Sequence, residues 1–526
     1  MGPVVPCSIG ECGGGQRFAP SLRGALYAQP VSDAPINFRP AGPSASADWP
    51  LAARLAWLRA FTRQIMAYEP ELTAAIEQDV GKPAWQALTG DVLTLLHACA
   101  WHRRRVRKLL RARAVRRAWT LLPGTRVTLT REPLGFVAII ATWNYPVQLL
   151  GIQLVQALMA GNRVVVKPCE RSPLSQLLLL RIARAAGAPG THLAWAEATR
   201  EAGPALLDAG PGPHLPGVTA GAGWDHVVFT GSTAVGRQIA AWAGPKLVGT
   251  TLELSGNDSA IVLGDANVRL AARTIFAAMT LNSGQTCLAP RRVLVLRRAA
   301  GPLLDELAVL VMNHPPLRLI DAGSAAQCAA MVEAALAGGA ANAGAAVGGG
   351  ADRTRVLAGT APMPEGEGGC WLRPVVVVDP PLDSDLVTCV ARDHFGPVLA
   401  VVPVADVGEA LRIHRSCGQH LSASVFTRDV RAGRELAAEL GASLVTINDC
   451  VIPGGHPGVA ITGHGASGWG ASRGEPGLLA LTRPVYVTTT GRVRPAVGPV
   501  SGSAVAWLRF GLGWMFGRSR KLPLGG

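Results

Sequence analysis

Short apolar runs rich in β-branched residues alternate with helical stretches along this chain, and no other feature restricts its fold as strongly. Residues 135–142 (GFVAIIAT), 163–166 and 225–229 are runs of this kind, and a turn and a stretch with helical spacing follow each of them. Repetition of strand, turn and helix predicts a parallel sheet with helices on both faces. Ligands of such sheets bind at the carboxyl ends of the strands.

A second alternating region runs over residues 257–426. Its strand-like segments are 260–263, 292–295, 374–378 and 399–402. At 526 residues the chain can hold two or three domains, because single hydrophobic cores stop growing at about 250–300 residues. We therefore predict the α/β class, with two parallel-sheet domains.

Other segments differ in composition. Residues 1–48 are rich in Gly, Pro, Ser and Ala and lack periodicity, which predicts a disordered N-terminal tail. Helical spacing begins at Leu51 and continues towards Arg117, and residues 125–131 alternate like an exposed strand. The Gly/Ala-rich residues 335–350 are either a linker or the end of a helix followed by a turn.

Ten scattered cysteines indicate a reducing compartment. They include no C-x-x-C pair and no histidine partner at zinc-ligand spacing, so we expect free thiols and no metal site. The N-terminus lacks the basic and apolar regions of a secretory signal, and residue 6 is a proline where a myristoylation motif has Ser or Thr. We expect a cytoplasmic protein.

The chain carries a net charge of +15, and nine of its basic residues lie between Arg103 and Arg117. A solvated helix face is the favoured interpretation of this cluster, ahead of an anionic membrane surface or nucleic acid. No zinc finger, recognition helix or basic array interleaved with aromatic residues accompanies it in the sequence. We predict no nucleic-acid partner.

The segment 503–521 combines apolar and basic residues near the C-terminus. It carries Trp507, Phe510 and Trp514 together with arginines and a lysine. Its apolar stretch is shorter than the ~20 residues that span a bilayer. Two interpretations stay open: an interfacial anchor that makes a peripheral membrane contact, and a tail that docks onto its own subunit or across a dimer.

Glycines follow the run HVVFT in the segment Gly231 to Gly236, which opens a helix. Free amide groups and the helix dipole in such a turn can bind phosphate. Arg237 and Gln238 stand where a nucleoside-triphosphate loop requires Lys and Ser/Thr, which argues against an NTPase. Taken alone, a glycine turn at this position more often serves packing.

Polar side chains also follow the first two runs. Lys167 and Glu170 end the second run, where they form either a cofactor contact or a surface ion pair. Asn144 follows the first run, where it could aim its amide at a developing oxyanion or simply cap a helix.

Cys287 and Glu253 are the candidate reacting groups. The polar approach from Asn282 to Gln285 favours an exposed Cys287, whose thiolate is a strong nucleophile when its pKa is lowered, although a buried structural thiol is the alternative. Glu253 lies between two leucines, and apolar surroundings raise the pKa of a carboxyl group towards the range of a general base.

Together these motifs resemble the aldehyde dehydrogenase superfamily, of the hydrolytic NAD(P)-dependent type, over roughly residues 51–490. The matching pieces, in order, are PLGFVAIIATWNYP, VVVKPCE, VVFTGSTAVG, LELSGND, NSGQTC, HFGPVL and GHGASGWG.

The resemblance implies an α/β fold with a Rossmann-like cofactor domain, a catalytic domain and a small β element for oligomerisation. The implied ranges are 49–119 and 134–254 for the NAD(P)-binding domain, 255–470 for the catalytic domain, and 120–133 with 471–490 for the oligomerisation element. Residues 491–526 would remain as a basic amphipathic tail. The family implies a homodimer or homotetramer.

The resemblance also implies a reaction. Cys287 would attack the aldehyde carbonyl to give a thiohemiacetal, while Asn144 and the backbone N–H of Cys287 hold its oxyanion. Hydride transfer to NAD, with NADP as the alternative, would leave a thioester, and Glu253 would activate the water that releases a carboxylic acid. The matching positions imply cofactor binding by Trp143, Lys167, Glu170, Gly231, Ser232, Asp393 and Phe395. They imply a substrate tunnel of Tyr145, Leu149, Ile152, Leu288 and Ile461, whose apolar character points to a hydrophobic aliphatic or aromatic aldehyde.

The chain departs from the family pattern at several positions. Asp393 replaces a common glutamate, Ser255 and Asp258 alter the residues after Glu253, and the segment 210–224 is longer than usual. Two rival functions stay open: a CoA-acylating relative, against which Glu253 argues, and an inactive scaffold that kept the fold.

Overall fold

The computed structural model describes residues 49–115, 125–211, 222–343, 354–357, 364, 366, 369–380, 382, 394–490 and 502–517. The predicted N-terminal tail and Asp393 lie outside these residues. The chain divides into two compact units. The first comprises Met1–Leu110 with Glu132–Arg483, and the second comprises Arg111–Arg131 with Pro484–Gly526.

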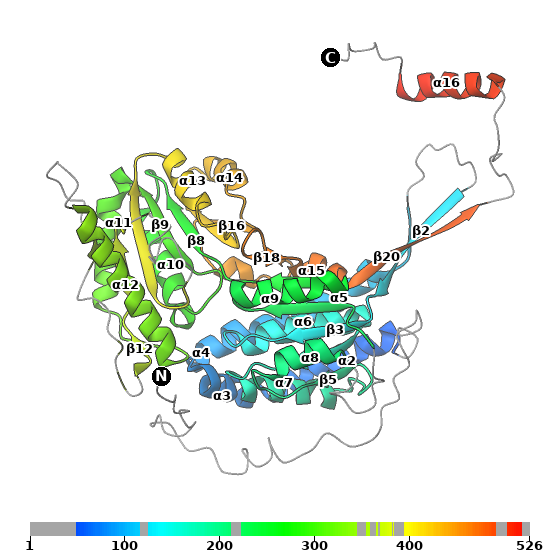
Figure 1. The fold of residues 1–526 in the computed structure, drawn as a ribbon, viewed down its shortest axis with the longest axis horizontal. Coiled ribbons are helices and arrows are strands. Elements are labelled where there is room, and N and C mark those ends of the chain that lie inside the picture. The colour runs from blue at the N-terminus through cyan, green and yellow to red at the C-terminus, as the bar shows by residue number, and fades with distance from the viewer. Residues whose placement is uncertain are drawn as a thin grey trace. The chain divides into compact units, whose positions relative to one another are not determined.

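The first α/β domain is built on a sheet of five parallel strands with a short antiparallel strand at one edge (Figure 1). In sheet order these are β18 (Gly468–Trp469), β7 (Gly249–Glu253), β6 (His226–Thr230), β3 (Phe136–Ile140), β4 (Arg163–Lys167) and β5 (Leu193–Trp195). The chain runs outward from β3 to β5 and then returns to the other side of β3, so strand order reverses between β3 and β6. Ligands of doubly wound sheets bind at such a reversal.

Helices cover both faces of this sheet, because alternate strand residues point to opposite sides. Val137, Ile139 and Val164 pack with α6 (Pro146–Ala160) and α7 (Pro173–Ala185). On the other face, strand residues pack with α8 (Ala202–Ala209) and α9 (Thr233–Ala243). All fifteen residues of α6 are buried, which explains its nearly continuous apolar sequence. The N-terminal helical segments are α2 (Leu51–Ala67), α3 (Glu69–Val80), α4 (Ala84–Gln86), the π-helix η1 (Ala87–Leu93) and α5 (Thr94–Leu110).

The second α/β domain repeats this plan. Its sheet order is β11 (Arg355–Val356), β13 (Val375–Val378), β14 (Val398–Val404), β9 (Pro290–Leu296), β8 (Asp258–Val262), β15 (Ser422–Phe426) and β16 (Leu444–Ile447), with only β11 antiparallel among these described strands. One face packs on α10 (Val268–Thr280) and α11 (Arg297–Met312), and the other on α12 (Ala322–Ala343), α13 (Val407–Arg415) and α14 (Val430–Glu439). The predicted α/β class with two parallel-sheet domains is confirmed.

Short elements complete the first unit. They are η2 (Gly244–Lys246), η3 (Leu281–Gly284), β10 (Leu317–Arg318), β12 (Trp371–Leu372), η5 (Ile452–Gly455), β17 (Ile461–Thr462), β19 (Ala471–Ser472) and α15 (Gly474–Ala480). The start of the Gly/Ala-rich stretch belongs to α12, so the helix-end interpretation holds there up to Ala343.

The helical pattern expected to continue towards Arg117 ends earlier. Helix α5 stops at Leu110, and β1 (Arg113–Ala114) pairs with β2 (Thr125–Pro133) instead. The N–H of Val115 donates to the carbonyl of Val127 at 2.9 Å, so the backbone after α5 makes hydrogen bonds with a neighbouring strand instead of continuing the helix. Arg103, Arg104 and Arg105 are exposed on α5, as the solvated-face interpretation expects.

The second unit holds β1, most of β2 and most of β20 (Thr482–Thr490), which form a three-stranded sheet, and α16 (Gly502–Phe516). The strand expected over 125–131 is thus part of β2, but most of its side chains are half-buried rather than exposed. Most side chains of β20 are exposed. Within the described residues, no helix is both long and apolar enough to cross a membrane.

Candidate active site

Four of the predicted polar positions lie at the carboxyl-terminal end of the parallel strands in the first sheet. Asn144 follows β3, Lys167 ends β4, Ser232 follows β6, and Glu253 ends β7. These parallel strands are neighbours, so their carboxyl ends lie side by side. The reversal of strand order between β3 and β6 falls between the turns that carry Asn144 and Ser232.

The turn that carries Asn144 is bonded to the loop that leads to Cys287. The Asn144 side chain donates from Nδ2 to the carbonyl of Gln285 at 3.1 Å. The Asn144 carbonyl accepts from Asn282 Nδ2 at 2.8 Å. Asn144 does not cap α6, because the N-cap position is Tyr145. The helix-cap alternative is therefore wrong, and the structure brings Asn144 and the loop before Cys287 together.

The loop before Cys287 is constrained by its backbone and by a buried arginine. Asn282 and Ser283 have φ values of 50° and 57°, and Gly284 has a φ of 76°. A Cβ on Gly284 would lie 2.4 Å from the backbone of Gly396, so only glycine fits. Arg291 donates from Nη1 to the Gly284 carbonyl at 2.8 Å. This arrangement fixes where the chain enters Cys287.

The polar residues from Asn282 to Gln285 predict an exposed Cys287, but the amide side chains of this approach are themselves buried. Asn282 is 2% exposed and Gln285 is 1% exposed, because their amides make hydrogen bonds inside the protein rather than with solvent. Cys287 itself keeps an intermediate exposure. The sulfur is thus neither sealed in the core nor on an open surface.

Cys287 has a raised pKa rather than the lowered one considered from the sequence. The pKa of its thiol is raised to about 11, mainly by burial and then by the negative charge of Glu253, while the charge of Arg473 opposes the shift. Near neutral pH the group is therefore a thiol rather than a thiolate.

Glu253 is a buried carboxyl group at the end of β7, with 5% exposure. Burial raises its pKa, and hydrogen bonds with Ser472 and Thr230 and the charge of Arg473 oppose that shift. The expectation of a raised pKa agrees with this direction. Its Oε1 atom is buried and has no hydrogen-bond partner among the described residues. A buried carboxylate oxygen without a partner is available to a water or a substrate proton.

Arg473 is a charged residue at this site that the sequence analysis missed. It is 6% exposed, has a φ of 64°, and donates from Nη1 to the carbonyl of Gly454 at 2.7 Å. Its charge lowers the pKa of both Cys287 and Glu253. Arg473 belongs to no recognisable motif, and the only feature that marks it in the sequence is that it is a single charged residue after a run of small residues.

The predicted substrate residues separate into two groups. Leu288 and Ile461 pack with Leu421 in an apolar cluster that Cys287 contacts. Tyr145 is buried, and its hydroxyl lies 2.7 Å from the hydroxyl of Thr286, the residue before Cys287. The other two predicted positions, Leu149 and Ile152, are buried in α6, and Ile152 belongs to the core of the first domain rather than to the Cys287 cluster.

The predicted cofactor residues form three pairs of neighbours. Lys167 donates to Glu170 at 2.5 Å, with the lysine buried and the glutamate exposed. The Trp143 and Phe395 rings meet edge to face, 5.8 Å between centroids. Gly231 precedes Ser232, whose hydroxyl accepts from the N–H of Val235 at the start of α9.

Gly231 is required by its surroundings, since an added Cβ would lie 2.4 Å from the Phe229 ring. An exposed helix start after a tight glycine turn suits a pyrophosphate, and an aromatic pair suits the planar end of a dinucleotide. The residues present therefore fit a nicotinamide dinucleotide at the carboxyl-terminal ends of these strands.

Comparisons with known proteins agree with this geometry. The profile of the aldehyde dehydrogenase family matches residues 39–487. The 4,4'-diapolycopene aldehyde oxidase of Methylomonas sp is 28% identical over 488 residues, covering 90% of this chain and 85% of the relative. A Mycobacterium tuberculosis relative, provisionally named as an NADP-dependent succinate-semialdehyde dehydrogenase, is 29% identical over 483 residues, covering 88% of this chain and 86% of the relative. The crystal structure of a gamma-glutamyl-gamma-aminobutyraldehyde dehydrogenase from Burkholderia cenocepacia aligns with a TM-score of 0.73 and 27% identity, covering 85% of this chain and 86% of that one. The chain therefore belongs to the aldehyde dehydrogenase family and is an NAD(P)-dependent oxidoreductase.

Proposed function

We propose that this protein oxidises a hydrophobic aldehyde to the carboxylic acid, through a thiohemiacetal and a thioester on Cys287. The observation that carries the proposal is the position of Cys287, which keeps partial exposure, contacts an apolar cluster and is electrostatically coupled to the buried Glu253.

The chain's own groups account for each bond change. Cys287 Sγ bonds to the carbonyl carbon, the C=O double bond opens, and the thiol proton ends on the carbonyl oxygen, which gives the thiohemiacetal. A nicotinamide cofactor, when bound, would supply the hydride acceptor for oxidation of this adduct to a thioester. Glu253 then removes a proton from the water that attacks the thioester, and its raised pKa suits that role. Release of the acid restores the thiol.

Asn144 supplies the oxyanion contact in this proposal, together with the backbone N–H of Cys287. A side-chain amide carries two N–H groups. One of them donates to the Gln285 carbonyl, which leaves the second for the substrate oxygen. Removing one such donor costs about 10²- to 10³-fold in kcat in other enzymes.

The dinucleotide cofactor would be held by the residues that the resemblance implies: Trp143, Lys167, Glu170, Gly231, Ser232, Asp393 and Phe395. Glu170 presents an exposed carboxylate beside Lys167, where it would repel an extra 2′-phosphate and favour NAD over NADP. The NADP in the name of the mycobacterial relative points the other way. Steady-state kinetics with NAD and NADP, on the native chain and on Glu170→Gln, decides between them.

An apolar aldehyde is the substrate class that the cluster of Leu288, Leu421 and Ile461 supports. The Methylomonas relative is named for a diapolycopene aldehyde. Arg473 favours a second candidate, an aldehyde that also carries a carboxylate, in line with the succinate-semialdehyde name of another relative. Turnover of octanal, benzaldehyde and succinate semialdehyde, each with NAD and with NADP, separates the two classes.

We also propose that the protein is a homodimer or homotetramer and that α16 contacts membranes. Exposed strand β20 supports the first proposal, because an unpaired edge can add to a neighbour's sheet. Trp507 is 73% exposed and Phe510 65% exposed on α16, with the exposed Arg509 between them, which supports an interfacial contact with anionic lipid.

A further inference from the structure

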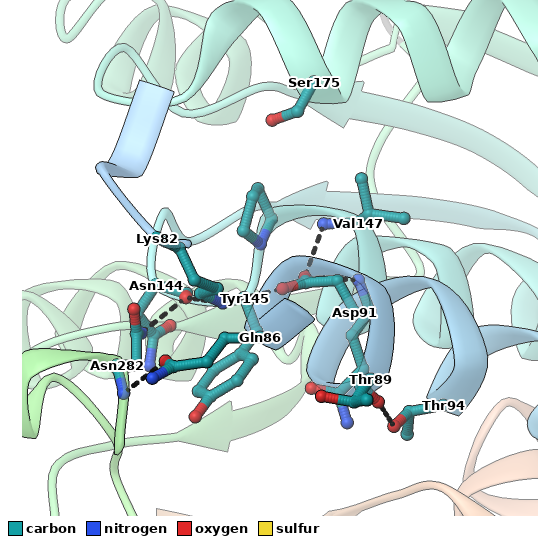
Figure 2. A network of polar contacts seen from close by, with 12 residues as sticks. Lys82, Gln86, Thr89, Asp91, Thr94, Asn144, Tyr145, Val147, Ser175 and Asn282 are labelled. Atoms are coloured by element: carbon teal, nitrogen blue, oxygen red, sulfur yellow. Dashed lines mark hydrogen bonds and ion pairs between the residues drawn. The ribbon is translucent and has the colours of Figure 1, made fainter. Parts of the chain in front are cut away.

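A buried ion pair contacts the turn that carries Asn144 (Figure 2). Lys82 Nζ lies 2.6 Å from Asp91 Oδ2, and both side chains are fully buried. Lys82 lies between α3 and α4, and Asp91 lies in η1, so neither belongs to the strand ends described above. Burying such a pair is costly and is weak evidence of a stabilising role, so its contacts decide what it does.

The ammonium group of Lys82 has three partners. It donates to Asp91 and to the backbone carbonyl of Asn144, the latter at 2.9 Å. It also lies 3.8 Å from the centroid of the Tyr145 ring. Two of these partners are consecutive residues of the turn after β3, so the lysine fixes this turn through its backbone and through an aromatic face.

The carboxylate of Asp91 holds the first turn of α6, which begins at Pro146 directly after Asn144 and Tyr145. Its Oδ1 atom accepts from the N–H groups of Val147 at 3.2 Å and Gln148 at 3.1 Å. These are the first free N–H groups of α6, whose N-cap Tyr145 makes no side-chain capping bond within the described structure. A carboxylate at a helix N-terminus satisfies these donors and the helix dipole.

The Asn144 carbonyl accepts a second bond from the nucleophile loop. Asn282 Nδ2 donates to it at 2.8 Å, so Lys82 and Asn282 together occupy both lone pairs of this oxygen. Gln86, between Lys82 and Asp91 in the sequence, accepts from the N–H of Asn282 at 2.8 Å (Figure 2). Residues 82–91 therefore contact both the turn that carries Asn144 and the loop that leads to Cys287.

We propose that Lys82 and Asp91 are positioning residues that hold the side-chain amide of Asn144 in the oxyanion geometry by fixing its backbone. The inference rests on the proposed role of Asn144. A shift of about 1 Å in a group that acts on the transition state can cost about 10²-fold in rate. The pair thus acts on kcat through Asn144 and not on aldehyde binding.

A double-mutant cycle on kcat tests this directly. Lys82→Met, Asn144→Ala and the double variant are compared with the native chain. We expect each single change to lower kcat by about 10²-fold with KM changed by less than about 3-fold, and the double variant to stay within about 3-fold of Asn144→Ala. If Lys82→Met lowers kcat by the same factor in the native chain and in Asn144→Ala, the proposal is overturned. A merely structural effect of Lys82 would not depend on the Asn144 side chain.

Arg54→Met is the matched control, because Arg54 is also a buried cation bonded to the same helix. Its Nη1 donates to the Met159 carbonyl at 2.6 Å, at the far end of α6 from Asn144. We expect this variant to lower the melting temperature and to leave kcat within about 2-fold. An equal kcat loss in Arg54→Met would assign the Lys82 effect to general destabilisation and overturn the proposal.

If Lys82→Met does not accumulate as folded protein, Lys82→Met/Asp91→Asn takes its place in the cycle. This variant leaves no unpaired buried charge, and its Asn can still accept from Val147 and Gln148. Unchanged kcat in Asn144→Ala would overturn the inference alone. Retained turnover in Cys287→Ala would instead contradict the proposed function, so the two failures are distinguishable.

Discussion

At the scale of single residues, Arg473 and Asp258 place opposite charges near the proposed nucleophile. Arg473 lowers the pKa of Cys287 and Asp258 raises it. Asp258 is itself buried, which raises its pKa to about 7, and it accepts from the Ser422 hydroxyl at 2.7 Å. Removing either charge should therefore change the alkylation rate of the Cys287 thiol, and the two changes should be opposite in direction.

Arg473→Met should slow alkylation of Cys287, and Asp258→Asn should speed it at pH above about 7, where the native aspartate is charged. Loss of the cation moves the thiol pKa further above about 11, and loss of the anion moves it down. Each pKa unit changes the thiolate fraction about tenfold below the pKa. Iodoacetamide rates mapped to the Cys287 peptide by mass spectrometry, between pH 7 and 10, measure this. Shifts of the same sign in both variants would contradict it.

Glu253→Gln should separate the two halves of the reaction. Glutamine has nearly the same shape but cannot take a proton from water, so thioester hydrolysis should slow by about 10²- to 10⁴-fold. A burst of reduced cofactor should precede slow turnover, and intact mass spectrometry should detect an acyl adduct on Cys287. Absence of both the burst and the adduct, with the variant folded, would remove Glu253 from the hydrolytic step.

At the scale of elements, the β-branched runs predicted β3, β4, β6, β8 and β9 because buried parallel strands are apolar on both faces. The end of α5 was not predictable, because residues 111–115 keep helical composition and pair with β2 through the backbone. Lys82 and Asp91 carried no signal either. Lys82 bonds to Asn144, and Asp91 bonds to Val147 and Gln148, so their partners are more than fifty residues away in the sequence. A lone lysine or aspartate resembles any solvated surface residue.

Strand β20 gives a prediction about assembly. Tyr486 is 60% exposed and Val487 is 51% exposed. Val487→Lys would place like charges opposite one another where two copies pair at this edge. We expect light scattering after size exclusion to give a dimer or tetramer for the native chain, and a smaller mass or a higher dissociation concentration for the variant. An unchanged assembly would exclude the β20 edge as the interface.

Helix α16 gives a prediction about lipid. Trp507→Ala/Phe510→Ala removes two exposed aromatic side chains, and Trp85→Ala, which removes a 62% exposed tryptophan of α4, is the matched control. The native chain and the control should float with vesicles that contain phosphatidylglycerol, and the double variant and a chain lacking residues 503–526 should not. Unchanged flotation of the truncated chain would exclude α16 as the membrane contact.

At the scale of the whole first unit, the site needs both α/β domains. Asn144 and Glu253 follow strands of the first sheet, and Cys287 precedes β9 of the second. Direct hydrogen bonds join them, from Asn144 Nδ2 to Gln285 and from Asn282 Nδ2 to Asn144. The family resemblance implied that Asn144, Glu253 and Cys287 share one site, but only the structure identifies these hydrogen bonds and the segment from Lys82 to Asp91.

The most direct test of the central claim is the stoichiometry of cofactor reduction by the purified full-length chain. With octanal as substrate and NAD or NADP as acceptor, we expect one reduced nucleotide per octanoic acid formed, and no turnover in a folded Cys287→Ala variant. Turnover retained by that variant, or nucleotide binding without reduction for every aldehyde tested on the native chain, would contradict the account.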